Sequence, residues 1–369
     1  MRTVLAHEWL APTGGSENVF EQLMEIYPDS RNICLWNDAP QRFPRNIEET
    51  WVARTPLRRS KALSLPFLSR AWKSVDLAST DRVIVSSHAF GHHLAARAAD
   101  AGLGAYSYVH TPARYVWAPE FDDRGQSRLA RAGRRHFMKT DRRATSSRVN
   151  YVANSEFVRD RIRAAWEQDA GVIYPPVEID LIQGRPAWRD EVVDAAEIER
   201  LDGLPLEFVL GASRLVEYKR LDTAITVGEE LGLPVVIVGS GPDEDRLREL
   251  AAQSSVPVTF FGYASTPALY ALYQAAALFV FMAIEDFGIM PVEAMALGTP
   301  VLVRHEGGAR ESIERVGGGV VIEGTSAAQL REGGRSAIDI PMDRAIDAVS
   351  QFSRTEFSRR VRAWAGEAS

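Results

Sequence analysis

Short apolar runs alternate with amphipathic segments along most of this 369-residue chain. The runs have the length of buried strands, and the segments between them carry apolar residues at the three- and four-residue spacing of a helix. Such alternation predicts an α/β fold, in which parallel sheets are covered by helices on both faces. The predicted strands cover residues 4–6, 82–86, 105–109, 149–153, 207–210, 234–238, 258–261 and 278–282.

These strands form two sets, which predicts two doubly wound domains that face each other, with a ligand at the carboxyl ends of the strands. The residues between the sets, 185–205, include a charged stretch and end on Asp202-Gly-Leu-Pro205, and are predicted to be a linker or a surface excursion. We place the first domain at residues 1–175 and the second at 176–342. The remaining residues, 343–369, have a helical pattern.

Composition narrows the class of protein. A hydrophobic content of 46% and a charged content of 25% are typical of a soluble globular protein. The longest uncharged apolar run, residues 275–284, is half the length of a membrane span, and no signal peptide is recognisable, so we expect a cytoplasmic protein. The single Cys34 excludes an intrachain disulfide and a cysteine metal cage.

The segment from Glu285 to Pro300 carries the most chemical information. It follows the predicted strand 278–282 and enters a helix whose first turn holds Pro291, a position where proline is tolerated. Gly288 then lies at the helix N-terminus, where free N–H groups suit a phosphate. Glu285 and Glu293 bracket this corner and can accept hydrogen bonds from hydroxyls. Together these features predict a site for a sugar nucleotide.

The same segment resembles the paired-glutamate motif of the family 4 retaining glycosyltransferases, including its flanks Phe287-Gly288, Glu293-Ala-Met-Ala and Gly298-Thr-Pro-Val. The resemblance implies the GT-B fold, two Rossmann-like domains facing across a cleft, with 343–369 crossing back onto the first. It further implies that Glu293 binds the ribose, that Glu285 orients the sugar, and that the backbone at Phe287, Gly288 and Ile289 holds the diphosphate.

Two cations follow the predicted strand 207–210. Arg214 and Lys219, in Gly211-Ala-Ser-Arg-Leu-Val-Glu-Tyr-Lys219, resemble the Arg-to-Lys clamp of this family. Fixed cations would stabilise the negative charge that develops on a departing diphosphate. By themselves they could equally be surface cations at a helix start. With both cations in place, no metal or other cofactor is expected, and we interpret Asp243-Glu-Asp245 as acidic residues at a helix start rather than a Mg²⁺ site.

Two glycine loops are further candidates. Gly14 and Gly15 precede a predicted helix over residues 16–27, where they form either a tight turn or a loop that lies over the donor diphosphate, as the family has it. Gly239 opens Gly239-Ser-Gly-Pro after a predicted strand, near the nucleotide in the family. It lacks the full fingerprint of a dinucleotide-binding loop.

His110 ends the predicted strand 105–109, in His110-Thr-Pro-Ala-Arg-Tyr-Val-Trp117. It matches the family histidine that contacts the donor sugar, and the whole run resembles a mannosyltransferase-like subgroup, which favours GDP-mannose over UDP-sugars as the donor. A buried histidine bonded to a carbonyl is the ordinary alternative.

His88 ends another predicted strand and is a candidate contact to acceptor or donor. Its proximity in sequence to His92 and His93 raises the alternative of a three-histidine metal site. We reject that alternative because the spacing is irregular and no carboxylate motif accompanies the three histidines.

Basic residues concentrate in the first half. The formal net charge is −6, yet residues 1–180 carry more Lys and Arg than Asp and Glu. One group interleaves with apolar residues over 54–73. A second group has helical spacing: Arg124, Arg128, Arg131, Arg135, Lys139 and Arg142. Such a stripe is either a solvated helix face or a surface that docks on an anionic bilayer, and the resemblance favours the membrane. Nucleic acid is disfavoured because no recognition motif is present.

The sequence therefore predicts a metal-independent, retaining hexosyltransferase. Its partners would be a nucleotide sugar and a hydroxyl acceptor, which is a lipid-linked sugar, a glycan or a small molecule, and it would act in the cytoplasm or at the cytoplasmic membrane face. A sugar-nucleotide epimerase of the same fold and a non-catalytic sugar-nucleotide-binding protein remain the alternatives. A binding protein would never turn the donor over, and an epimerase would need no acceptor.

Overall fold

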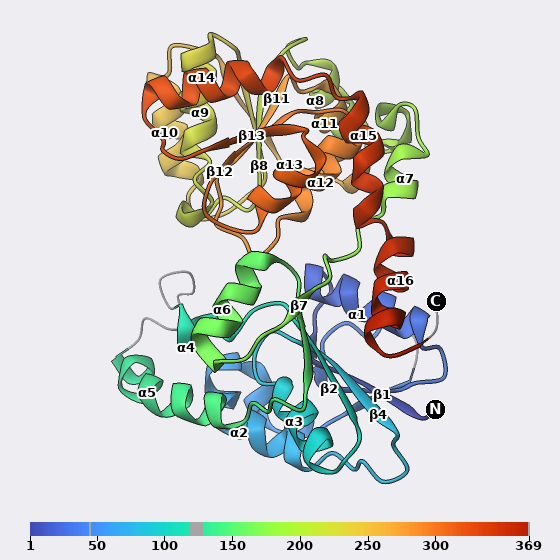
Figure 1. Ribbon diagram of the computed structural model, residues 1–369. Coiled ribbons are helices and arrows are strands. Elements are labelled where there is room, and N and C mark those ends of the chain that lie inside the picture. The colour runs from blue at the N-terminus through green and yellow to red at the C-terminus, as the bar shows by residue number, and fades with distance from the viewer. Residues whose placement is uncertain (44–45, 119–127, 368–369) are drawn as a thin grey trace. The chain divides into compact units, whose positions relative to one another are not determined.

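The computed structural model describes residues 1–43, 46–118 and 128–367 and divides into two compact units (Figure 1). The first unit consists of Met1–Pro176 together with Phe357–Ser369, and the second of Val177–Glu356. Each unit has its own parallel sheet and its own core. The prediction of an α/β fold with two doubly wound sheets is confirmed.

The first unit is built on a seven-stranded sheet in the order β3-β2-β1-β4-β5-β6-β7, with every pair parallel. The strand order changes direction between β1 and β4. In doubly wound sheets the carboxyl edge at such a point is where ligands bind. The strands are β1 (Thr3–Leu10), β2 (Arg31–Asn37), β3 (Ile47–Glu49), β4 (Arg82–Ser87), β5 (Gly104–Val109), β6 (Asn150–Ala153) and β7 (Gly171–Val172).

Alternate residues of β1 point to opposite sides of the sheet. Because the apolar residues on both sides are buried, helices cover both faces. Val4 and Ala6 belong to one core cluster, and Leu5 belongs to the other. The described helices are α1 (Gly15–Ile26), η1 (Trp51–Arg54), η2 (Pro56–Arg59), α2 (Lys61–Lys73), α3 (His92–Asp100), α4 (Arg114–Trp117), α5 (Arg128–Arg143) and α6 (Glu156–Trp166).

The last helix, α16 (Arg354–Trp364), completes the core of the first unit and lies beside α1 (Figure 1). Phe357 and Val361 are buried in the same cluster as Leu5 and the apolar face of α1. The hydroxyl of Tyr106 donates to the carbonyl of Ala365 at 3.3 Å. Residues from both ends of the chain therefore share one core.

The second unit has a six-stranded parallel sheet in the order β10-β9-β8-β11-β12-β13, which changes direction between β8 and β11. The strands are β8 (Val209–Ala212), β9 (Val235–Val238), β10 (Val258–Gly262), β11 (Leu278–Phe281), β12 (Val301–Arg304) and β13 (Gly319–Ile322). Its helices are α7 (Ile179–Gln183), η5 (Trp188–Glu191), α8 (Ala195–Asp202), η6 (Glu217–Lys219), α9 (Asp222–Leu231), α10 (Glu244–Gln253), α11 (Thr266–Ala275), α12 (Ile289–Ala296), α13 (Ala309–Val316), α14 (Ala327–Ile338), α15 (Asp343–Ala348) and η7 (Val349–Phe352).

Of the two predictions for residues 185–205, the linker is wrong, because this segment folds into η5 and α8 and packs on the surface of the second unit. Trp188 is buried, and its indole N–H donates to the carbonyl of Ile182 at 2.9 Å. Asp194 caps α8. The carboxylate of Glu197 accepts hydrogen bonds from the backbone and the hydroxyl of Ser265, each at 2.6 Å.

Candidate functional site

The predicted site residues fall into two groups, one in each unit. In the second unit, Lys219 at the end of η6 forms an ion pair with Glu285, which lies in the loop after β11. The pair is mostly shielded from solvent, with side-chain exposures of 10% for Lys219 and 24% for Glu285. The loops after β8 and β11 adjoin because these two strands are neighbours at the switch point of the sheet. A cation and a carboxylate far apart in sequence thus meet at one sheet edge.

Arg214 joins this group through Tyr218. The guanidinium of Arg214 donates to the hydroxyl of Tyr218 at 2.8 Å, and the ammonium of Lys219 lies over the ring of Tyr218, 5.2 Å from its centre. Both predicted clamp cations therefore contact one aromatic side chain in the turn between β8 and α9.

The corner after β11 is held by close backbone packing. Gly288 has φ 89°, in the region that glycine adopts most easily, and precedes the first residue of α12, Ile289. A Cβ atom at Gly308 would lie 2.1 Å from the carbonyl oxygen of Asp286, so only glycine fits there. The ring of Phe287 is buried against Phe352, with ring centres 5.5 Å apart. These contacts fix the start of α12.

Glu293 lies on α12 and is partly buried. The hydroxyl of Tyr270 donates to its carboxylate at 3.3 Å. Burial raises the pKa of Glu293 to about 7, and the hydrogen bond from Tyr270 opposes that rise. A carboxyl group with this pKa exchanges its proton near neutral pH.

Gly239 has a packing role in the structure. Its φ is 127°, and a Cβ atom there would lie 1.8 Å from the carbonyl oxygen of Ser213. Its N–H donates to the carbonyl of Gly262 at 2.8 Å. The loops after β8, β9 and β10 can touch only because the residue is glycine. Nearby, the carboxylate of Asp243 makes two hydrogen bonds of 2.7 Å with Arg246 at the start of α10.

In the first unit, His110 follows β5 and is 8% exposed. Its Nε2 lies 2.8 Å from the hydroxyl of Ser86, and Nδ1 of His7 lies 3.0 Å from the same hydroxyl. Gly14 and Gly15 lie at the start of α1, where Gly14 is the N-cap and Gly15 the first helical residue. A Cβ atom at Gly14 would lie 2.1 Å from a carboxylate oxygen of Glu17.

His88 lies beside Glu8, its Nδ1 being 3.2 Å from a carboxylate oxygen of that residue. Glu8 is fully buried and accepts hydrogen bonds from the hydroxyl of Ser87 and the backbone N–H groups of Ala89 and Gly91 at 2.9, 3.1 and 2.7 Å. These bonds fix the loop after β4. Ligand atoms of His7, Glu8 and His88 lie within 4.8 Å of one another, close enough to share a metal ion.

The sequence prediction missed His7 and Glu8 because it ended the first strand at residue 6, and it gave Ser86, at the end of the predicted strand 82–86, no role in the site. β1 continues to Leu10, and both His7 and Glu8 are completely buried in it. The sequence signal for these residues was their position: His7 and Glu8 directly continue an apolar strand that leads to the loop at Gly14 and Gly15.

The structure corrects the expectation that no carboxylate accompanies His92 and His93. Asp141 of α5 is buried between them, with one oxygen 3.2 Å from Nε2 of His92 and 3.4 Å from Nε2 of His93. Its other oxygen accepts the indole N–H groups of Trp117 and Trp166, both at 2.8 Å. His88 is not part of this group, because it contacts Glu8. Asp141 therefore joins α3, α4, α5 and α6.

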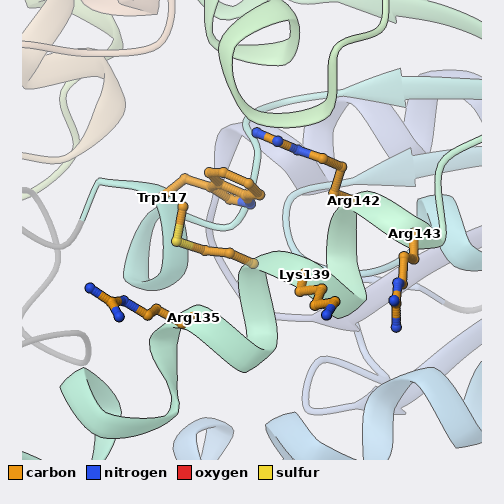
Figure 2. Close-up of a pocket in the computed structure, with 6 residues that line it drawn as sticks. Trp117, Arg135, Lys139, Arg142 and Arg143 are labelled. Atoms are coloured by element: carbon orange, nitrogen blue, oxygen red, sulfur yellow. The ribbon is translucent and has the colours of Figure 1, made fainter.

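A pocket of about 460 Å³ lies between α4 and α5 (Figure 2). Trp117 and Met138 supply apolar surface. The cations at its rim are Arg135, Lys139, Arg142 and Arg143. Arg142 lies over the ring of Trp117, 5.5 Å from its centre, and donates to the carbonyl of Ala165 at 2.8 Å. The pocket combines an apolar wall with positive charge.

The predicted basic stripe can be followed only in part. Arg124 lies outside the described residues, as do the side chains of Arg128 and Arg131. Arg135, Lys139 and Arg142 lie on α5, as the spacing predicted. Among the described residues, no helix is long and apolar enough to cross a membrane.

Residues 203–350 match the family model "Glycosyl transferases group 1". A GDP-mannose-dependent α-(1-6)-phosphatidylinositol monomannoside mannosyltransferase of Mycobacterium tuberculosis is 32% identical over 52% of this chain and 53% of that protein. A related mannosyltransferase of Corynebacterium glutamicum is 28% identical over 55% of this chain and 56% of its own length. The chain spans about half the length of the curated relatives it matches.

Among solved structures, the Anabaena HepE protein in complex with UDP aligns with a TM-score of 0.72 at 18% identity, covering 98% of this chain and 99% of its own. WaaG, a glycosyltransferase involved in lipopolysaccharide biosynthesis, aligns with a TM-score of 0.63 at 18% identity, covering 100% and 96%. These two alignments establish the GT-B fold, in which each of two α/β units has a parallel sheet.

Proposed function

We propose that this chain, whose residues 203–350 match the family model of the group 1 glycosyl transferases, is a retaining hexosyltransferase that uses a nucleoside-diphosphate sugar. The observation that carries the proposal is the group formed by Arg214, Tyr218, Lys219 and Glu285 at one edge of the second sheet. All four residues lie inside the segment that matches the family.

The nucleotide would bind to the second unit. Glu293 accepts hydrogen bonds from the ribose hydroxyls, and the N–H groups at the start of α12, near Gly288 and Ile289, face the diphosphate. Arg214 and Lys219 add two positive charges. Glu285 orients the sugar ring, and His110 is proposed to contact the donor sugar, as its resemblance to the family histidine implies.

During transfer, the bond between the sugar C1 and the diphosphate oxygen breaks, and a bond forms between C1 and the acceptor oxygen on the same face. The acceptor proton passes to the departing phosphate oxygen. Negative charge grows on the diphosphate as the bond lengthens, and Lys219 and Arg214 stabilise it. Since these cations supply the positive charge, we propose that the reaction requires no metal ion.

Lys219 is paired with Glu285. Binding of a diphosphate would bring a second anion to the same ammonium and draw it away from Glu285. The carboxylate would then accept hydrogen bonds from sugar hydroxyls. The ion pair thus keeps both side chains in place before the donor arrives.

GDP-mannose is the donor that the relatives favour, since the mycobacterial and corynebacterial proteins are described as GDP-mannose-dependent. A UDP-sugar is the second choice, because the Anabaena structure contains UDP. The same relatives act on a phosphatidylinositol monomannoside, and we propose an acceptor of that type, a sugar on a lipid.

The pocket between α4 and α5 supports a lipid-linked acceptor and a peripheral position on an anionic membrane. Its cations, with Lys139 and Arg143 exposed, would attract anionic headgroups, and Trp117 and Met138 would contact the apolar part of a lipid. The protein would then act at the cytoplasmic face.

Two alternatives remain. A sugar-nucleotide epimerase would convert the donor without an acceptor, and a binding protein would hold the donor unchanged. Neither requires two cations placed to stabilise a leaving diphosphate, so the geometry favours the transferase.

The test is to incubate the full chain with GDP-mannose, UDP-glucose or dTDP-glucose and lipid-extract acceptors, with and without EDTA, and to follow thermal stability and glycolipid formation. We expect stabilisation by one nucleotide class and transfer that EDTA leaves unchanged. Stabilisation with no transfer to any acceptor would favour a binding protein, and a new sugar nucleotide formed without acceptor would favour an epimerase. No stabilisation by any nucleotide sugar would refute the nucleotide site.

A further inference from the structure

Three polar side chains lie end to end at the carboxyl edge of the first sheet. His7 is on β1, Ser86 on β4, and His110 follows β5. The hydroxyl of Ser86 is 3.0 Å from Nδ1 of His7 and 2.8 Å from Nε2 of His110. His7 and Ser86 are completely buried and His110 is nearly so. The three strands are adjacent in the sheet, so the chain of contacts follows from the strand order.

The hydrogen positions in this chain follow from one carbonyl group. Nδ1 of His7 also lies 3.1 Å from the backbone carbonyl oxygen of Ser86. A carbonyl oxygen only accepts, so Nδ1 of His7 must carry a proton, which it shares between the carbonyl and the hydroxyl of Ser86. The hydroxyl has a single hydrogen, and among the described residues its remaining hydrogen-bond contact is Nε2 of His110, so the hydrogen is directed there. That nitrogen must then be an acceptor without a proton.

The neutral form of His7 agrees with this assignment. Burial lowers its pKa well below the usual value, and the nearby His88 and His110 lower it further, whereas Glu8 opposes them. These three are the titratable groups that act on the ring. His7 is also held in place, because its ring stacks on Phe20 of α1 with ring centres 5.2 Å apart.

We propose that His7 and Ser86 are positioning residues that hold His110 in the neutral tautomer with its proton on Nδ1. This inference rests on the proposed function only where it assigns His110 to the donor sugar. With a proton on Nδ1, His110 is a hydrogen-bond donor through that nitrogen, and sugar oxygens are suitable acceptors. A neutral ring also leaves the diphosphate to Arg214 and Lys219. The backbone N–H of His110 donates to the carbonyl of Ser87 at 2.8 Å, which fixes the residue relative to β4.

Histidine ring nitrogens can be distinguished by long-range ¹H–¹⁵N spectra of the full chain labelled with ¹⁵N-histidine, and His110→Asn assigns the signals. At pH 7.5 we expect Nδ1 of His110 to show the chemical shift of a protonated nitrogen and Nε2 that of an unprotonated one. A wild-type ring with its proton on Nε2 would overturn the proposal. This measurement uses His110→Asn only to assign the signals, and it does not depend on activity.

The variants Ser86→Ala and His7→Phe test the consequence for transfer. Each removes one link, and we expect kcat to fall roughly tenfold, as for the loss of one buried hydrogen bond, with the KM for the nucleotide sugar nearly unchanged. Ser86→Thr keeps the hydroxyl and His7→Asn keeps a donor near the position of Nδ1, so both should restore kcat. In Ser86→Ala, the His110 signals should shift toward a mixture of the two tautomers.

A wild-type kcat in Ser86→Ala would overturn the positioning role, and so would equal losses in Ser86→Ala and Ser86→Thr. If the wild-type protein transferred no sugar, the proposed function would fail by itself, while the spectra would still decide the tautomer of His110.

Discussion

The hydroxyl of Tyr270 donates a hydrogen bond of 3.3 Å to the carboxylate of Glu293, which has a pKa of about 7 because it is buried. A carboxylate can accept hydrogen bonds from a ribose only through its oxygen lone pairs, and protonation converts one oxygen into a donor. The protonation state of Glu293 therefore controls whether the proposed nucleotide site can accept hydrogen bonds from a ribose.

We expect the affinity for a nucleotide sugar to rise as the pH increases through about 7, because Glu293 then becomes a carboxylate. Tyr270→Phe removes a bond that stabilises the charged form, so the midpoint should move to higher pH. Titration calorimetry between pH 5.5 and 8.5 measures this. A nucleotide sugar is the proper ligand because its diphosphate, esterified at both ends, does not titrate in this range. Glu293→Gln serves as the control and should bind with no dependence on pH. A flat profile in the wild type would contradict the assignment.

The same raised pKa has a consequence for stability. Between pH 4.5 and about 7 the folded protein keeps the proton on Glu293 while the unfolded chain loses it. The contribution of this residue to the free energy of unfolding therefore decreases as the pH rises through that range. Urea denaturation at pH 5 and pH 7.5 measures this contribution. The free energy of unfolding should decrease more between the two pH values in the wild type than in Glu293→Gln.

Replacement of Lys219 should impair transfer far more than it impairs folding. Lys219→Met removes one of the two cations that stabilise the departing diphosphate. We therefore expect kcat to fall about 100-fold or more. Arg248→Met is the matched control, because Arg248 is an exposed cation of the same unit that pairs with Glu244 on α10. The measurement is initial rates of sugar transfer together with thermal unfolding. An equal effect of both substitutions would argue against the clamp.

Asp141 should be one of the most sensitive stability positions of the first unit. In Asp141→Asn, two indole and two imidazole groups lose their charged partner, and we expect a loss of about 3 kcal/mol in the free energy of unfolding. The control is Asp100→Asn, since the ion pair of Asp100 with Arg148 is exposed. Urea denaturation of the two variants decides the matter, and similar losses in both would contradict a special role for Asp141.

Acid should destabilise this group of side chains. Burial lowers the pKa of His93 to about 4 from 6.5, so the unfolded chain takes up a proton on this residue before the folded protein does. Stability is therefore lost as the pH falls from about 6.5 to about 4. The pKa of Asp141 is also lowered, so its contribution is lost as the pH falls further through its folded value. His93→Gln should reduce the slope of unfolding free energy against pH between 6.5 and 4.

Binding to anionic vesicles tests the pocket between α4 and α5. Each cation near an anionic surface contributes about 1 kcal/mol, so Lys139→Ala combined with Arg143→Ala should weaken binding about 30-fold. Arg335→Ala with Arg248→Ala removes two exposed cations of the second unit and is the control. Co-sedimentation with phosphatidylserine-containing and neutral vesicles supplies the measurement. Equal binding to both kinds of vesicle would exclude an electrostatic contact.

The sequence predicted several strands from their apolar runs but missed β12 and β13, although residues 301–303 and 320–322 are uninterrupted apolar runs. Residues 278–282 were assigned to a strand, and β11 covers Leu278–Phe281. β2 was also missed, although residues 33–36 are apolar, and the polar residues Arg31, Asn32 and Asn37 lie at its ends. The corner at Gly288 could be predicted because the helix start, the glycine and the proline are local in sequence.

Contacts between distant residues were beyond local patterns. Asp141 lies almost fifty positions after His92, and no sequence pattern near either residue predicts their contact. The ion pair of Lys219 and Glu285 needed the strand order, which a list of strands does not contain. Glu8 was unremarkable in sequence because a charged residue at a strand end is usually exposed, whereas here it binds the loop after β4.

The return of α16 to the first unit bears on how the protein is made. Phe357 and Val361 complete a core whose members from Leu5 to Ile173 were synthesised before the second unit. At about 5–20 residues per second, the intervening second unit takes roughly ten seconds or more to emerge from the ribosome. Throughout that time the nascent first unit exposes the apolar surface of α1 that α16 later covers, whereas the second unit, contiguous in sequence, can fold as soon as it has emerged. The unit translated first is thus the one that finishes folding last, and it is the part of the nascent chain for which a chaperone would matter most.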